Sequence, residues 1–101
     1  MMDSIKLSEI QILPIKPQNG LIAFASCILN NHIYLGDIAI HTTLDGKGFR
    51  LVYPTKTLAN GKTFNVFHPI TREAGQAISF AITNKYMALI ADIEAEKVWK
   101  K

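Results

Sequence analysis

The side chains best suited to chemistry in this chain are basic and lie in its middle. Between Lys47 and Lys85 there are six Lys or Arg residues and one acidic residue, Glu73, so the local net charge is six minus one, or +5, in a chain whose total is +3. A local excess of this kind is typical of a surface that binds a polyanion. We expect the phosphates of a nucleic acid to be contacted by Lys56, Lys62, Arg72 and Lys85.

Three aromatic residues, Tyr53, Phe64 and Phe67, lie among these basic residues. Aromatic rings stack on bases in proteins that bind single-stranded nucleic acid, so this role requires the rings to be at the surface. The alternative is that the rings belong to the core and the lysines form an ordinary solvated surface. The residues by themselves leave both interpretations open.

Metal and thiol chemistry have little support in the sequence. His32, His41 and His68 are not spaced as an HxH or HExxH motif, and no carboxylate triad accompanies them. Cys27 lies in a run of small and apolar residues, where a free cysteine is usually an inert core residue. We therefore expect no metal site and no catalytic thiol.

Phosphate-loop and paired-carboxylate sites are equally unsupported. Gly46-Lys47-Gly48 lacks the Walker spacing and precedes a predicted strand, whereas phosphate-binding loops precede a helix. Asp37 and Asp45 are the only acidic residues between Lys16 and Glu73, which leaves little for a glycosidase-like or two-metal site. The sequence thus predicts a protein that is not an enzyme and needs no cofactor.

The bulk composition indicates one soluble domain spanning residues 1–101. Apolar residues make up 49% and charged residues 19% of the chain, as in ordinary globular proteins. Its apolar runs are shorter than the roughly 20 residues needed to cross a membrane, and the N-terminus has no pattern of an export signal. A single cysteine allows no internal disulfide, so we expect a cytoplasmic protein with no membrane association.

Alternating apolar and polar residues, punctuated by Gly, Asn and Pro, predict an antiparallel meander of about five strands over residues 4–67. We expect a bulge near Glu9, an end to the first strand at Pro14 and Pro17, and an exposed loop over 55–62 with a turn at Asn60-Gly61. The strands are predicted over 5–15, 21–29, 32–42, 49–53 and 63–67.

After the strands, the apolar period changes from two to about 3.6, which predicts one long helix over about 71–95. Thr71 is the expected N-cap, Glu73 suits the first turn, and the tail to 101 is expected to fray. The fold class is therefore α+β, with the helix covering one face of the sheet. Its apolar stripe is predicted to contain Ala74, Ala77, Ile78, Ala81, Ile82, Tyr86, Leu89 and Ile93.

An ordered set of short motifs in this chain resembles the stage V sporulation protein G (septation protein SpoVG) family. Pro54-Thr55-Lys56 follows a predicted strand, Gly61 lies in the polar loop, and His68-Pro69-Ile70-Thr71 leads into the helix. Asp37-Ile38 also matches the family's third strand, and the resemblance covers about residues 5–86.

The resemblance implies a bacterial regulator that forms a homodimer, binds DNA or RNA and affects septation and sporulation. Lys56 matches the family's lysine after Pro-Ser, and Arg72 falls where the helix often begins with a basic or polar residue. Thr57 stands where a second basic residue is common, and Asn65 stands where aspartate is frequent.

Two functions are weighed on this basis. The first is a nucleic-acid-binding regulator whose binding weakens as salt is raised, because phosphate contacts release counterions. The alternative is a non-enzymatic protein-interaction module in cell division or phage-related biology, whose binding tolerates salt.

Overall fold

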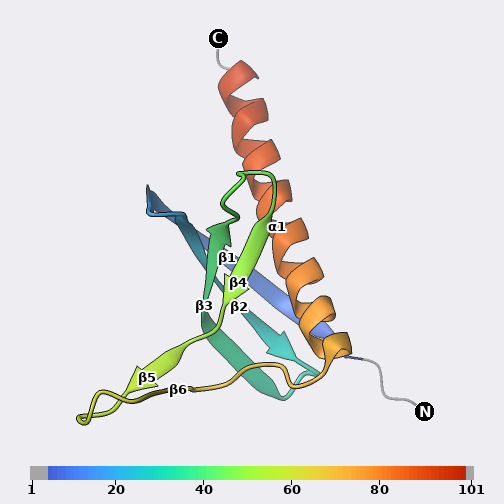
Figure 1. The fold of residues 1–101 in the computed structure, drawn as a ribbon. Coiled ribbons are helices and arrows are strands. Elements are labelled where there is room, and N and C mark those ends of the chain that lie inside the picture. The colour runs from blue at the N-terminus through green and yellow to red at the C-terminus, as the bar shows by residue number, and fades with distance from the viewer. Residues whose placement is uncertain (1–4, 100–101) are drawn as a thin grey trace.

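The computed structural model describes residues 5–99, with side chains placed as far as Ile93. A four-stranded antiparallel sheet has the order β1-β2-β3-β4, and one long helix, α1, follows (Figure 1). The predicted α+β class is confirmed. The bounds are β1 Leu7–Gln18, β2 Leu21–Leu29, β3 Ile33–Thr42, β4 Phe49–Val52, β5 Thr55–Thr57, β6 Thr63–Asn65 and α1 Arg72–Trp99.

Two tight turns join the first three strands. Asn19 and Gly20 have φ of 54° and 90°, and Asn30 and Asn31 have φ of 51° and 63°. Positive φ at both central residues gives the turn whose twist matches that of paired strands, and Asn and Gly accept it at least cost. These residues therefore make β1, β2 and β3 neighbours in chain order.

Both strands that pair with β2 contain a bulge. The predicted bulge at Glu9 is confirmed, since Glu9 has φ of 50° and the β1–β2 register shifts between Ser8 and Gln11. A second bulge lies at Asp37, with φ of 62°, where the β2–β3 register also shifts. This bulge inserts one residue into β3, so Leu35 and Ile38 both point into the core despite their odd spacing.

Two strand predictions were wrong in detail. The first strand does not end at Pro14 and Pro17 but continues to Gln18. Because β1 is an edge strand, a proline there need not give up a ladder hydrogen bond. In addition, β6 does not join the main sheet as a fifth strand. It pairs with β5, inside the segment predicted as a loop over 55–62, to form a separate two-stranded sheet.

The core lies between one face of the sheet and α1. Two rows of paired residues face the helix, one through Ala23 and Ile40 and the other through Ala25 and Ile38. At one side of this layer, the rings of Phe49 and Tyr86 meet edge to face, 5.3 Å apart. The fully buried set is Ala23, Ala25, Cys27, Leu35, Ile38, Ile40, Ile78 and Ile82.

The opposite sheet face, which we call the open face, is not covered by α1. A row of paired residues crosses all four strands there, consisting of Leu13, Phe24, Ala39 and Val52. Leu13 is 65% exposed, and Tyr34 on β3 is 68% exposed. Apolar side chains on this face therefore lie at the surface of the subunit.

The helix begins and packs largely as predicted. The Thr71 hydroxyl accepts a hydrogen bond from the Ala74 N–H at 3.0 Å, which confirms the N-cap. The segment predicted to fray after residue 95 is helical as far as Trp99, and residues 100–101 lie outside the described part. Figure 1 shows this end of α1 extending past the strands, and Ile93, predicted in the apolar stripe, is exposed there.

Although α1 is 28 residues long, no helix within residues 5–99 carries an apolar stretch sufficient to cross a bilayer.

The buried helix face gives a direct stability test. Ile82→Asp is expected to lower the free energy of unfolding by on the order of 3–5 kcal/mol, because it places a carboxylate in a site with no solvent exposure. Phe80→Asp, two positions away and 70% exposed, should cost less than about 1 kcal/mol. Thermal denaturation followed by circular dichroism measures both, and equal melting temperatures would contradict the assigned helix face.

Candidate nucleic-acid interface

The β5–β6 hairpin carries two of the predicted phosphate-binding residues and is built by its turn. The Gly61 N–H donates to the Leu58 carbonyl at 2.9 Å, and the Leu58 N–H donates to the Lys62 carbonyl at 2.7 Å. Gly61 has φ of 90°, and the Asn60 side chain accepts from the Lys62 N–H at 3.0 Å. This is the three-residue hairpin connection that needs glycine in the left-handed region. The predicted turn at Asn60-Gly61 is confirmed.

Cross-strand pairing divides the hairpin into two faces. Lys56 lies directly opposite Phe64 in the β5–β6 register. Because directly opposed residues project to the same side and side chains alternate along a strand, Leu58, Lys62 and Val66 share this side. We call it the Phe64 face. The other face carries Thr55, Thr57, Thr63 and Asn65.

Of the three aromatic residues considered, one is at the surface. Tyr53 and Phe67 are half-buried, and their rings meet edge to face at 5.9 Å against the core. Burial raises the pKa of the Tyr53 hydroxyl, and the nearby Cys27 adds to this effect. Phe64, in contrast, is 48% exposed. The core interpretation thus holds for Tyr53 and Phe67, and the surface interpretation holds for Phe64.

A short connector carries the chain from β6 to the helix start. The Nδ1 atom of His68 lies 3.0 Å from the Pro69 carbonyl oxygen, within hydrogen-bond distance. Pro69 lies beside Gly75 in the first turn of α1. Arg72 is the first residue of α1 and is exposed, as are His68 and the hairpin lysines. The connector therefore links the hairpin to a basic helix N-terminus.

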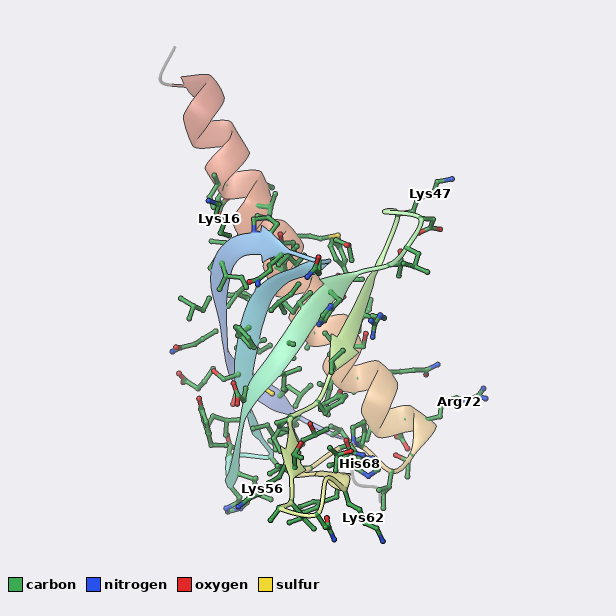
Figure 2. All side chains as sticks on the ribbon, turned by 60° about the vertical axis from the view of Figure 1, so that its left-hand side comes forward. Lys16, Lys47, Lys56, Lys62, His68 and Arg72 are labelled. Carbon is green, nitrogen blue, oxygen red and sulfur yellow. The ribbon has the colours of Figure 1, made fainter. Side chains whose placement is uncertain are left out.

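The basic residues that are close in sequence separate in space. Figure 2 shows Lys56 and Lys62 together on the hairpin and Lys47 toward the opposite end of the molecule. Figure 1 shows that the hairpin and the start of α1, which carries Arg72, lie on opposite sides of the sheet. Lys85 is exposed on α1, 13 residues beyond Arg72 and so about 20 Å further along the helix axis. Of the four predicted contacts, Lys56 and Lys62 share the hairpin, whereas Arg72 and Lys85 lie apart from them on α1.

The turn that contains Lys47 also contains an acidic residue, Asp45. The Thr43 hydroxyl donates to Asp45 Oδ1 at 2.6 Å, and the Lys47 N–H donates to the same oxygen at 3.0 Å. These two hydrogen bonds hold the pKa of Asp45 below its ordinary value. A carboxylate thus accompanies Lys47, while the hairpin and connector contain no acidic residue between Asp45 and Glu73.

The cysteine and the three histidines, which were candidates for a thiol or metal site, lie in different elements of the fold. Cys27 is buried in the core, as predicted, and burial raises the pKa of its thiol. His32 lies in the turn before β3, whereas His41 is in β3 and His68 is in the connector. Within residues 5–99, no three His, Cys, Asp or Glu side chains gather in a group that could hold a metal ion.

The sequence matches the model of a known protein family. Residues 5–88 match the family model for SpoVG. The chain belongs to the SpoVG family. The hairpin, the connector and the first half of α1 all lie within the matched region.

Two curated SpoVG relatives align over most of their length. A candidate septation protein SpoVG of Treponema denticola is 26% identical over 82 residues, covering 81% of this chain and 86% of the relative. A second, from Finegoldia magna, is 28% identical over 83 residues, covering 81% of this chain and 74% of the relative. The similarity to these SpoVG proteins therefore extends across the sheet, hairpin and helix.

The hairpin is expected to be the least protected part of the sheet structure. An isolated two-stranded hairpin is marginally stable, and all residues of β5 and β6 are exposed. In hydrogen–deuterium exchange, amides of residues 55–65 should exchange at least about tenfold faster than those of residues 23–27 in β2. Equal protection of the two segments would show that the hairpin is packed against another surface.

Proposed function

We propose that this SpoVG-family chain is a small cytoplasmic nucleic-acid-binding regulator that acts in septation or sporulation-type gene expression. The observation that carries the proposal is the placement of exposed Lys56, Lys62 and Arg72 on a hairpin and helix start, with no acidic residue between Asp45 and Glu73. The septation context comes from the names of the two relatives.

Phosphate contact follows from the chemistry of these groups. Lys56 and Lys62 place flexible ammonium groups on the hairpin, which projects from the main sheet (Figure 1). Arg72 presents a planar guanidinium in the first turn of α1, where unpaired backbone N–H groups and the helix dipole also favour an anion. Lys85 would add a contact only for a ligand long enough to follow the helix.

Strong readout of a DNA sequence is not expected from this surface. The exposed side of α1 near Arg72 carries Glu73, Gln76 and Ser79 rather than a set of Arg, Asn and Gln aimed at base edges. Affinity in this proposal comes mainly from phosphates, and any preference comes from the shape of the ligand or from the hairpin.

Homodimer formation is part of the proposal, with a second copy covering the open face of the sheet. Four strands about 4.8 Å apart, with an average length of about nine residues, give a flat area of roughly 600 Å². Side chains that project from the sheet add to this area and bring it near the roughly 800 Å² that each partner buries in a stable interface. The face carries exposed Leu13 and Tyr34 with charges of both signs, Asp37 and Arg50, which can pair with each other across a two-fold contact.

The phosphate contacts are tested by a double substitution. Lys56→Ala with Arg72→Ala should weaken binding to all sequences alike and flatten the dependence of log affinity on log salt by about 2 per subunit. Fluorescence anisotropy at several salt concentrations measures both quantities. Lys16→Ala with Lys47→Ala removes the same charge at the opposite end of the molecule and is the matched control. An unchanged slope in the first variant, or equal loss in both, contradicts the assignment.

The dimer surface is tested separately by sedimentation. Leu13→Lys places a charge on the open face beside its own copy and should raise the dimer dissociation constant by on the order of tenfold or more. Phe80→Lys adds the same charge on the outer side of α1, where Phe80 is 70% exposed, and should leave the dimer intact. A wild-type monomer at micromolar concentration, or dissociation by the Phe80 variant alone, contradicts this surface.

A further inference from the structure

Phe64 occupies the middle of the Phe64 face of the hairpin. It lies directly opposite Lys56 in the register and two residues from Lys62 along its own strand. Paired Cα atoms of this type are about 5.5 Å apart, and alternate residues along a strand are about 7 Å apart. Lys56 and Lys62 are therefore the residues next to Phe64 on this face, one across the hairpin and one along the strand.

The ring is available to a ligand because the core does not use it. Phe64 is 48% exposed, whereas Tyr53 and Phe67 pair with each other against the core. The hairpin that carries Phe64 projects away from the main sheet and α1 (Figure 1). Leu58 and Val66 are also exposed and share the Phe64 face, so Phe64 is part of an apolar patch rather than a single exposed residue. A contiguous exposed apolar patch of this kind is typical of an interaction site.

We infer that the Phe64 face binds single-stranded nucleic acid, with one unpaired base stacked on Phe64 and the adjoining phosphates contacted by Lys56 and Lys62. This inference rests on the proposed nucleic-acid-binding function and adds the class of ligand and the stacking residue. Aromatic stacking accepts every base, because every base has a π face.

Duplex binding would use the hairpin differently. In a duplex the base faces are covered by their neighbours, and only base edges are accessible in the grooves. A two-stranded ribbon in the major groove would turn Thr55, Thr57, Thr63 and Asn65 toward those edges, since these side chains can hydrogen-bond. Phe64 would then point away from the bases. The two binding modes therefore predict opposite effects of changing Phe64.

The test uses the full chain with labelled oligo(dT), oligo(U) and duplex DNA of about 12 nucleotides or base pairs. Phe64→Leu keeps an apolar side chain but removes the π face. It should weaken binding to the single strands by on the order of 5- to 100-fold and leave duplex binding within about twofold. Phe80→Leu, at an exposed phenylalanine on α1, is the matched control and should change neither.

A gain of signal provides an independent readout. Phe64→Trp should keep or tighten single-strand binding, and stacking should quench the new indole beyond the change given by the wild-type chain, whose single tryptophan is Trp99. Comparison of oligo(dT) with oligo(U) then distinguishes DNA from RNA as the source of the stacked base.

The outcomes separate this inference from the proposed function. If Phe64→Leu binds single strands as wild type does, while Lys56→Ala with Arg72→Ala weakens binding, the stacking inference is overturned and the phosphate-binding proposal stands. If Phe64→Leu weakens duplex and single-strand binding equally, the preference for single strands is overturned. If the folded wild-type chain binds none of the probes at low salt, both proposals fail.

Discussion

Contact between α1 and a stripe of small side chains on β2 is the interaction on which the rest of this structure depends. Ala23, Ala25 and Cys27 are all buried on the helix-facing side, so Ile78 and Ile82 can approach the sheet closely. Packing at this density tolerates neither a larger side chain on β2 nor a charge on the helix. Because this contact uses one sheet face only, it leaves the open face and the hairpin at the surface, where binding partners can reach them.

Backbone geometry then determines which side chains lie at those surfaces. The bulge at Asp37 keeps both Leu35 and Ile38 in the core, which a regular strand could not do. Pro54 separates β4 from β5 and cannot donate a backbone hydrogen bond, although its carbonyl accepts from the Val66 N–H at 2.8 Å. The chain therefore leaves the main sheet at Pro54 and pairs with itself, and this gives a hairpin whose strands have no neighbour from the sheet.

Much of this fold could be predicted from local chemistry. The Asn-Gly and Asn-Asn turns, the Glu9 bulge, the Thr71 cap and the buried face of α1 follow from positive φ, capping and helical periodicity, which act over a few residues. The partner of β6 could not be predicted in this way, because strand pairing is a tertiary choice. The alternation of Thr55-Lys56-Thr57 opposite Thr63-Phe64-Asn65 about a glycine turn was the available signal for the hairpin.

The candidate site was predictable in residue type but not in grouping. The charge count over the middle of the chain included Lys47, yet the β3–β4 turn places Lys47 beside Asp45 at the far end of the molecule. Likewise, three aromatic residues qualified from sequence, and burial separates Phe64 from Tyr53 and Phe67. Spatial proximity depends on long-range pairing, so a charge count along the sequence overstates the size of a surface patch.

The proposed homodimer would determine how much affinity such a small site can provide. One stacked base and the two hairpin lysines would form a limited contact, and salt would screen the attraction of the lysines to phosphate. A two-fold dimer through the open face would present two hairpins on one rigid body, so that binding at the first makes binding at the second an intramolecular event. The gain depends on whether a single strand can span both hairpins. Dimer geometry would then set the length of nucleic acid that binds well, while the chemistry of each hairpin would set its preference for an unpaired base.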